Sequence, residues 1–318
     1  MAIVFLGTSE FAAAILERLA ASETYRPALV LSRPDRPSGR GRRVSSPPAA
    51  ERARALGIAL EQPVSVNDPG VHALIAAAGG KAGPAAPAPP REQGGHGQTL
   101  VVCAFGALLK EPLLSEHEIL NVHPSLLPRW RGAAPIERAI MAGDARTGVS
   151  IMHLTAGLDS GPVALAEPEP ILEHDTYGSL SSRLQELGGE LLIRVLQERP
   201  RPRPQPSEGV TYAEKIAPED RLLDPGGPAV ELERTVRALT PHIGARVALA
   251  DGTLLGVERA ALVEIEGQPL AGGVWAHEER LLLACDPGTL ELLSVRPPGG
   301  RPMDGAAYLR GHGRPGLR

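Results

Sequence analysis

Continuous apolar runs and helical apolar stripes alternate along the N-terminal part of the chain. Residues 2–6 and 28–31 are uninterrupted apolar segments, which is typical of strands buried on both faces of a sheet. Between them, Thr8 and Ser9 can cap a helix whose apolar side chains recur at helical spacing. The order strand, turn, helix, strand predicts an α/β fold with a parallel, doubly wound, Rossmann-like sheet.

Further apolar segments extend this α/β pattern to the middle of the chain. We expect strands at residues 100–105, 119–122 and 149–154. Residues 177–198 place apolar side chains at helical spacing behind Thr176, which can cap the predicted helix. The pattern therefore predicts one α/β domain over residues 1–198.

Residues 199–206, RPRPRPQP, separate this domain from a segment with a different hydrophobic pattern. Alternating prolines favour extended polyproline geometry, so we expect a semi-rigid linker. Beyond it, after one helix at about 230–239, short apolar runs flank Asp251-Gly252, which is a strong hairpin signal. Further short strands between turns predict a small OB-like β-barrel domain over residues 207–318.

Residues 33–54 form the most basic segment, with seven arginines against two acidic residues. Its first half, RPDRPSGRGRR, predicts an irregular exposed loop, whereas the part from Ala49 can form a helix. The formal net charge of the chain is −4, so any contact with nucleic acid has to rest on a local patch of this kind. The alternative is an arginine-rich loop that is merely solvated.

Composition is that of a globular protein and disfavours several functional classes. Apolar residues make up 42% of 318 residues, and no window reaches the roughly 18 apolar residues of a membrane span. The first residues lack the features of a signal peptide, so we expect a cytoplasmic protein with no membrane partner. The two cysteines lie far apart and the nine histidines lack metal-ligand spacing, so we expect no metal.

The most informative stretch is NVHPSLLPRWRGAAPI at residues 121–136. Asn121 and His123 stand two positions apart at the end of an apolar strand, so their side chains point to the same face. In an open parallel sheet, ligands bind at the carboxyl ends of strands. The proline-bracketed loop that follows is stiff, and its two leucines suit a flat ligand with hydrogen-bonding edges.

A second polar loop, TAGLDSG at residues 155–161, presents Asp159 directly after another strand. Asn, His and Asp without a Ser or Cys nucleophile disfavour covalent catalysis and suit direct acyl transfer to an amine. Asn121 and His123 can bind the oxyanion of a tetrahedral intermediate, while Asp159 helps to remove the amine proton or sets the protonation of His123. The alternative is an Asn turn, a core histidine and a loop aspartate.

Several long, ungapped segments resemble the 10-formyltetrahydrofolate-dependent formyltransferases, from residue 2 to about residue 310. The clearest are NVHPSLLPRWRGAAPI and TGVSIMHLTAGLDSGP. FLGTSEFA, RPDRPSGRG and TYAEKI resemble the branch of that family that formylates methionyl-tRNA. The resemblance implies a Rossmann-like formyltransferase domain joined to an OB-like C-terminal domain that binds tRNA.

The resemblance also implies roles for particular residues. The catalytic trio would be Asn121, His123 and Asp159. The folate contacts would be Ser125, Leu126, Leu127 and Pro128. The basic loop would reach the acceptor end of initiator tRNA through Arg36, Arg40, Arg42 and Arg43. The co-substrate would be 10-formyltetrahydrofolate and the partner initiator methionyl-tRNA, and we expect a monomer.

Residues 79–98 depart from the family pattern, with six glycines and four prolines in a segment without hydrophobic period. We expect a disordered surface insertion between a helix and a strand, at the end of the sheet opposite the chemistry. The alternative keeps the same core and changes the acceptor to a nucleotide-sugar or another small amine, although a sugar acceptor gives no reason for the arginine-rich loop. A ribonucleotide transformylase would need a phosphate-cradling glycine loop after the first strand and would lack residues 207–318. A non-catalytic RNA-binding module would have no use for the trio.

Overall fold

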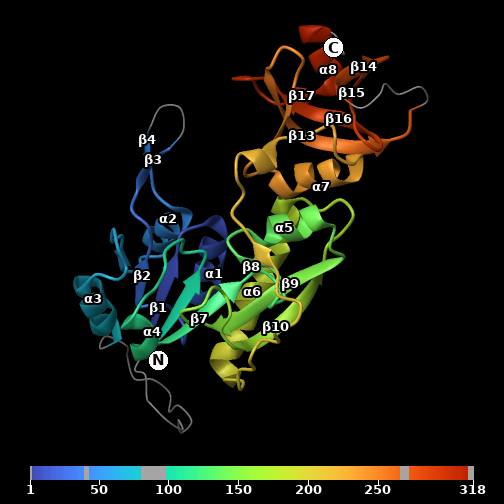
Figure 1. Ribbon diagram of the computed structural model, residues 1–318. Coiled ribbons are helices and arrows are strands. Elements are labelled where there is room, and N and C mark those ends of the chain that lie inside the picture. The colour runs from blue at the N-terminus through green and yellow to red at the C-terminus, as the bar shows by residue number, and fades with distance from the viewer. Residues whose placement is uncertain (1, 39–42, 80–97, 266–271, 314–318) are drawn as a thin grey trace. The chain divides into compact units, whose positions relative to one another are not determined.

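A seven-stranded sheet lies at the centre of the first part of the chain in the computed structural model, which describes residues 2–38, 43–79, 98–265 and 272–313 (Figure 1). Its strands are Ala2–Gly7 (β1), Leu29–Leu31 (β2), Leu60–Glu61 (β5), Gln98–Cys103 (β6), Glu118–His123 (β7), Arg146–His153 (β9) and Val163–Pro170 (β10). They follow the order β10-β9-β7-β6-β1-β2-β5. The strands from β5 to β7 in this order are parallel, whereas β9 is antiparallel to β7. The predicted Rossmann-like class is confirmed.

Helices cover both faces of this sheet (Figure 1). They are Glu10–Ala20 (α1), Pro48–Ala55 (α2), Pro69–Gly79 (α3), Leu113–Glu116 (α4) and Tyr177–Glu198 (α6). Val4 and Leu6 of β1 share a core with side chains of α3 and α4. On the other face, a Cβ at Gly188 of α6 would lie 3.2 Å from Val122 and 3.3 Å from Ile15. Because the strands are buried between two helical layers, their sequences are continuous apolar runs.

The predicted helix caps are present at two helices. The hydroxyl of Ser9 accepts a hydrogen bond from the Ala12 amide at 3.3 Å, at the start of α1. The hydroxyl of Thr176 accepts one from the Ser179 amide at 3.3 Å, at the start of α6. Each bond satisfies an amide that the first turn of a helix leaves without an intrahelical partner.

The basic segment contains regular structure, so the prediction of a purely irregular loop is wrong. Arg36–Ser38 (β3) and Arg43–Ser45 (β4) pair in antiparallel fashion, with Pro37 opposite Val44. A two-stranded ribbon consists of edge strands alone, and edge strands tolerate proline. The predicted helix after Ala49 is α2. The expected site residues Arg40 and Arg42 lie outside the described residues.

The ends of the expected insertion belong to regular elements. Gly79 is the last residue of α3, and Gln98 is the first residue of β6. Gln98 is buried, and its Nε2 donates to the carbonyl of Ile75 at 2.6 Å. Residues 80–97 lie outside the described part of the chain.

The chain divides by its internal contacts into two compact units. The first contains Met1–Ala133, Gly148–Glu169 and Ser182–Tyr212, and the second contains Ala134–Thr147, Pro170–Ser181 and Ala213–Arg318. Short strands at Arg131–Gly132 (β8) and Tyr212–Ala213 (β11) complete the elements before the C-terminal region.

The second unit contains a curled antiparallel sheet. Its strands are Ala245–Ala248 (β12), Leu254–Val263 (β13), Gly273–His277 (β14), Arg280–Ala284 (β15), Thr289–Arg296 (β16) and Met303–Asp304 (β17). They follow the order β12-β13-β16-β15-β14, with β17 on β16, and the two outer strands β12 and β14 approach each other. The predicted hairpin around Asp251-Gly252 is the β12–β13 pair. The expected barrel-like C-terminal fold is therefore confirmed as a half-barrel.

Helices close the core of this second unit. They are Pro135–Ala142 (α5), Ala229–Leu239 (α7) and Gly305–His312 (α8), with one 3-10 turn at Glu219–Arg221. Leu232 and Val236 of α7 pack with Val247, Leu283 and Leu290 of the sheet. The predicted helix at about 230–239 is α7.

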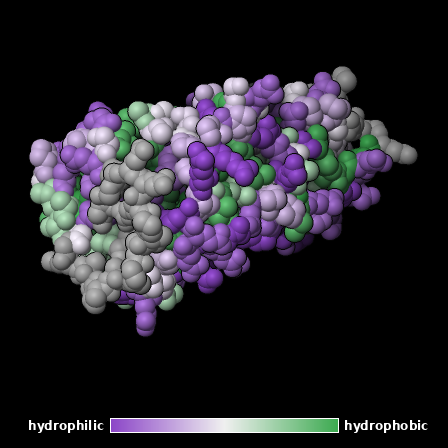
Figure 2. All heavy atoms as spheres, turned by 90° about the horizontal axis from the view of Figure 1, so that it is seen from below, coloured by the Kyte–Doolittle hydropathy of each residue, from purple (hydrophilic) through white to green (hydrophobic). Residues whose placement is uncertain are grey.

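On the face in Figure 2, hydrophilic residues predominate and hydrophobic residues form separate areas. Exposed large apolar side chains include Val64, Leu108 and Leu158. Within the described ranges, the helices lack the length and apolar content that a membrane crossing requires.

Candidate active site

The site begins on β7, which carries Asn121 and His123 on one face of the sheet. Both residues are buried, at 8% and 4% relative exposure. The antiparallel strand β9 pairs His123 with Ser150 and Leu120 with His153, so its chain then leaves the sheet at the opposite end. The loop after β9 therefore has to run back across the sheet to reach the end of β7.

This returning loop brings Asp159 to the two β7 side chains. Asn121 Nδ2 lies 3.4 Å from Asp159 Oδ1, and His123 Nδ1 lies 3.7 Å from Asp159 Oδ2. The amide of Gly132 donates to the same Oδ2 at 2.8 Å. The side chains of His123 and Asp159 are 5% and 12% exposed. The structure thus brings the three expected catalytic residues together around one carboxylate, largely shielded from water.

Hydrogen bonding sets the tautomer of His123. Its Nε2 lies 2.8 Å from the carbonyl oxygen of Trp130. A carbonyl only accepts, so Nε2 carries a hydrogen and Nδ1 is the nitrogen that faces Asp159. When the ring is protonated, Nδ1 presents a second donor beside the amide of Asn121, and the carboxylate stabilises the charge.

Two site residues have backbone conformations that non-glycine residues rarely adopt. The φ angles of Trp130 and Asp159 are 62° and 41°. Such conformations cost on the order of 1–3 kcal/mol each and persist where surrounding contacts hold them. Trp130 is held by Thr211, whose hydroxyl accepts from the Trp130 amide at 2.9 Å and whose carbonyl accepts from Arg131 at 2.9 Å.

The loop expected to contact folate is ordered by internal hydrogen bonds. Ser125 is fully buried, and its hydroxyl donates to the carbonyl of Arg129 at 2.6 Å. The Ser150 hydroxyl donates to the Ser125 carbonyl at 2.7 Å and accepts from the Leu127 amide at 3.1 Å. Ser125 therefore shapes this loop, while its hydroxyl hydrogen is already donated inside it.

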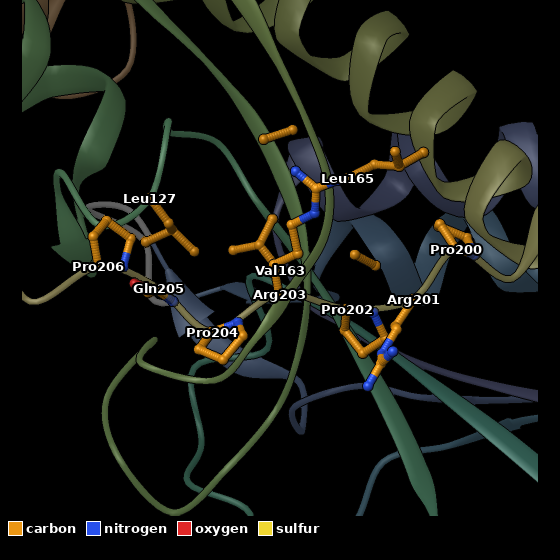
Figure 3. Close-up of a pocket in the computed structure, with 12 residues that line it drawn as sticks. Leu127, Val163, Leu165, Pro200, Arg201, Pro202, Arg203, Pro204, Gln205 and Pro206 are labelled. Carbon is orange, nitrogen blue, oxygen red and sulfur yellow. The ribbon is translucent and has the colours of Figure 1, made fainter.

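The other members of this loop are only partly buried. Leu126, Leu127 and Pro128 have intermediate exposure. Leu127 also lines a groove of about 980 Å³, together with residues of β10 and of the linker (Figure 3). Apolar side chains that are partly exposed beside the trio can contact the flat ring of a ligand.

A second cavity of about 420 Å³ lies where β1, β2 and β6 end. It is lined by Thr8, Arg33, Arg36, Ser46 and Phe105, among others. β1 has β2 on one side and β6 on the other, so these ends form the topological switch point of the sheet, where ligands bind in open α/β folds. Of the four expected tRNA-contacting arginines, Arg36 thus lines a cavity with cationic and hydroxyl groups.

Two residues at the site were missed by the sequence pattern. Gln205, in the linker, contacts the backbone of the Asp159 loop, and Thr211 holds the loop that follows β7. Neither residue type carries a signal of its own in a proline-rich or turn-rich segment. Thr211 lies in the TYAEKI segment, whose resemblance to the family is the one signal that points to it.

An ion pair anchors the beginning of β7 to the end of α6. Glu118 Oε2 accepts from Thr99 Oγ1 and from Arg199 Nη1, both at 2.6 Å. Burial opposes ionisation of Glu118, but these hydrogen bonds and the charge of Arg199 together lower its pKa. Burial lowers the pKa of the neighbouring His153, an effect that Glu118 opposes and Arg199 reinforces.

The other candidate chemistries find little support in this part of the molecule. Cys103 is buried, and burial raises the pKa of its thiol. A buried thiol of raised pKa is a poor nucleophile. Among the described residues, His, Cys, Asp and Glu side chains form no group that could hold a metal ion.

Comparison with known families matches both halves of the chain. Residues 1–196 match the formyl transferase family, and residues 215–313 match the formyl transferase C-terminal domain. The first match ends near the last residue of α6, and the second begins inside the TYAEKI segment. The segment between them includes the linker.

Two relatives of similar length carry the same name. A methionyl-tRNA formyltransferase of Cereibacter sphaeroides is 39% identical over 322 residues, which cover 99% of this chain and 97% of the relative. A methionyl-tRNA formyltransferase of Dechloromonas aromatica is 38% identical over 316 residues, covering 98% and 96%.

Solved structures with lower identity share the fold. A methionyl-tRNA formyltransferase from Clostridium thermocellum superposes with a TM-score of 0.56 at 14% identity, covering 86% of this chain and 97% of the other. An N-formyltransferase from Helicobacter canadensis gives a TM-score of 0.63 at 14% identity, covering 92% and 99%. HypX from Aquifex aeolicus gives 0.61 at 18% identity, and the chain spans only 47% of HypX. Both family matches and the full-length relatives agree, and the chain belongs to the formyltransferase family, in its methionyl-tRNA formyltransferase branch.

Proposed function

We propose that the chain transfers the formyl group of 10-formyltetrahydrofolate to the α-amino group of methionyl-initiator tRNA. The observation that carries this proposal is the convergence of Asn121 and His123 on the two oxygens of Asp159. The hydroxyl of Ser125, in the loop after β7, is buried and donates to the carbonyl of Arg129. A site with donors and a carboxylate but without an activated nucleophile suits direct attack by the amine of the acceptor.

The transfer proceeds through a tetrahedral intermediate. The free amine attacks the formyl carbon, a new C–N bond forms, and the carbonyl oxygen becomes an oxyanion. Asn121 Nδ2 and protonated His123 Nδ1 stabilise this oxyanion. The amine gives up a proton, N10 of the folate gains one, and the C–N10 bond breaks. Asp159 moves the amine proton, directly or through water, or acts electrostatically on His123.

The folate co-substrate is assigned to the neighbourhood of the trio. Ser125, Leu126, Leu127 and Pro128 form its contact segment in this proposal, with Ser125 acting through the shape of the loop. The HypX structure that shares this fold is a complex with tetrahydrofolic acid, so a protein that contains this fold binds a folate.

The tRNA contacts are assigned to the basic hairpin and the C-terminal region. Arg36, at the switch-point cavity, and Arg40, Arg42 and Arg43, which follow it in the basic segment, contact the acceptor end. Residues 1–198 form the catalytic domain, 199–206 the linker, and 207–318 the tRNA-binding domain. A translation enzyme of this kind acts in the cytoplasm, as a monomer and without a metal.

A nucleotide-sugar acceptor is the second candidate. The Helicobacter canadensis neighbour is a complex with folinic acid and dTDP-3-aminofucose, so a formyltransferase sheet can serve a sugar amine. That neighbour is 14% identical, whereas the methionyl-tRNA formyltransferases are 38–39% identical over nearly the full chain. The full-length similarity and the arginine-rich hairpin favour the tRNA acceptor.

One assay tests this proposal. Purified full-length chain is given 10-formyltetrahydrofolate and either methionyl-initiator tRNA or methionyl-elongator tRNA, and the formylated product is measured. Transfer to the initiator alone supports donor, acceptor and specificity together. Folate turnover only with a dTDP-amino sugar would favour the second candidate, and no folate turnover with any acceptor would refute both.

A further inference from the structure

The side chain of Gln205 makes four polar contacts from the linker into the site. Its Nε2 donates to the carbonyl oxygens of Asp159 and Gly161, both at 2.8 Å. Its Oε1 accepts from Arg131 Nε at 3.0 Å and from Arg131 Nη2 at 2.7 Å. In Figure 3, Gln205 lies at the end of the groove where Leu127 lies, while Pro200 and Arg201 lie at the other end.

Glutamine is the residue type that fits these four contacts. A carbonyl oxygen only accepts hydrogen bonds and a guanidinium only donates them, whereas a primary amide has two donors and two acceptor positions. The partners therefore fix the orientation of the amide, with Nε2 toward the loop and Oε1 toward Arg131. Glutamate would keep the contact with Arg131 and lose both donors to the loop, and methionine would lose all four.

The held segment is the strained turn that carries the catalytic carboxylate. Asp159 has a φ of 41°, and a Cβ on Gly161 would lie 1.9 Å from the carbonyl oxygen of His153, so the turn packs against β9 without spare room. Gln205 ties both ends of this three-residue turn. A strained conformation persists only when its surroundings hold it.

The same contacts join the loop to β8. Arg131 binds the Gln205 amide, and the next residue, Gly132, donates its own amide to Asp159 Oδ2 at 2.8 Å. Arg131 thus holds the backbone of Asp159 through Gln205, and the adjacent Gly132 holds its carboxylate directly. A small movement of the turn would change the distances from Asp159 to Asn121 Nδ2 and His123 Nδ1, which are now 3.4 Å and 3.7 Å.

We propose that Gln205 is a positioning residue for formyl transfer, which fixes the turn of Asp159 against Arg131 and thereby holds the carboxylate in register with Asn121 and His123. This proposal rests on the proposed function. It also gives the linker a second task, because a segment expected to be a spacer supplies a support of the catalytic carboxylate.

The test compares two substitutions in the full-length chain with a matched control. Gln205→Met removes the four contacts, and Gln205→Glu removes only the two to the loop. Gln197→Met makes the same chemical change on the exposed surface of α6. For each variant, kcat, KM for 10-formyltetrahydrofolate, KM for methionyl-initiator tRNA, the pH dependence of kcat and the melting temperature are measured.

The expected result is a selective loss of turnover. Displacement of a catalytic group by an ångström can lower a rate about 100-fold, so we expect kcat of Gln205→Met to fall roughly 10- to 100-fold. The kcat of Gln205→Glu falls nearly as far, and both KM values stay within about twofold. The part of the pH profile of kcat that depends on His123 and Asp159 also shifts. Gln197→Met behaves as wild type.

Other outcomes overturn the proposal. Wild-type kcat and pH profile in Gln205→Met would show that the amide only ties down the linker. A rise of KM for tRNA with unchanged kcat would place Gln205 in tRNA binding instead.

A second readout separates this proposal from the proposed function. Failure of the wild-type chain to formylate methionyl-tRNA refutes the function itself. Amide hydrogen exchange over residues 155–161 then tests, independently of activity, whether Gln205 holds the turn of Asp159. Faster exchange in Gln205→Met than in Gln197→Met supports it, and equal exchange refutes it.

Discussion

The proposed catalytic trio and the basic hairpin of β3 and β4 differ in how the fold fixes them. Asn121 and His123 are buried on a central strand, and both face the carboxylate of Asp159. Arg36, in contrast, is exposed on a two-stranded ribbon, and residues 39–42 lie outside the described residues. The proposed chemistry thus rests on contacts shielded from water, and the proposed tRNA recognition on exposed charge.

This difference has energetic consequences that can be measured separately. Interactions among buried polar groups are screened little by salt, whereas exposed charges are screened within about 10 Å at 0.1 M ionic strength. Changes in the trio should therefore alter turnover at any salt concentration. Changes in the hairpin should alter affinity for tRNA, and more strongly at low salt.

The largest expected effect comes from removing the charge of Asp159. Asp159→Asn keeps the size of the side chain but no longer stabilises a protonated His123, so we expect kcat to fall by roughly 100-fold or more. The melting temperature should stay close to that of the wild type. Formyl transfer under saturating substrates measures the effect, with Asp68→Asn on the exposed surface as control. Near wild-type kcat would contradict the role of Asp159.

The trio is also the part of the site that the sequence predicts best. Asn121 and His123 follow from strand alternation, because residues two apart share a face, and Asp159 follows from a glycine-bracketed loop. The antiparallel direction of β9 does not follow from the pattern, because a continuous apolar run does not show whether a strand is parallel or antiparallel to its neighbour. The returning course of the Asp159 loop is therefore visible only in three dimensions.

Contacts between distant segments explain the remaining differences. The pairing of Pro37 with Val44 depends on a ribbon whose partner strands have little apolar pattern of their own. The contacts of Gln205 join a proline-rich linker to a loop more than forty residues earlier in the chain. Sequence periodicity reports which side of an element is buried, not which polar group a buried carbonyl will meet.

A smaller effect is expected from the hairpin. Arg36→Ala removes one cation at the switch-point cavity, so we expect weaker tRNA binding and a salt dependence reduced by about one unit of slope. At saturating tRNA, kcat should be unchanged. Binding constants for initiator tRNA over a range of salt concentrations measure this effect.

Arg18→Ala is the control for this measurement. Arg18 is also an exposed arginine, but it lies in the last turn of α1, whereas the switch-point cavity lies where β1 ends and before α1 begins. It should leave both affinity and slope unchanged. If the salt dependence of tRNA binding is also unchanged in Arg36→Ala, the arginines of the hairpin are merely solvated and do not contact tRNA.

The ion pair of Glu118 and Arg199 is only partly buried and lies outside the proposed trio, so it tests stability separately from chemistry. The pKa of Glu118 is lowered in the folded state, so its stabilising contribution is fully present above its unfolded pKa and is lost as pH falls through the folded pKa. We expect Glu118→Gln to lower the free energy of unfolding at pH 7 by roughly 1–2 kcal/mol, discounted for partial exposure, with little effect on kcat.

Denaturant unfolding of both proteins at pH 7 and at progressively lower pH measures this contribution. The difference between wild type and Glu118→Gln should shrink in the acid range below the ordinary glutamate pKa of 4.5. A difference that is constant across this range would mean that packing, not charge, accounts for the loss.

The smallest effect is expected from the inserted segment. A Cβ on Gly79 would lie 2.3 Å from Gln98 Nε2, so the two ends of the segment are adjacent and a short linker can join them. They lie where α3 ends and β6 begins, at the end of β6 opposite the switch-point cavity. Replacing residues 80–97 by a few glycines should therefore leave formyl transfer within about twofold of wild type.

A deletion extended to Gln98 is the informative comparison for this variant. Gln98 is buried and its amide binds the carbonyl of Ile75, so its loss should lower the melting temperature, while the shorter deletion should not. A shorter deletion that folds but has lost activity would contradict the placement of the segment away from the chemistry. Retained activity in both variants, with lower stability in the longer one, would show that the segment matters to the enzyme only through its ends.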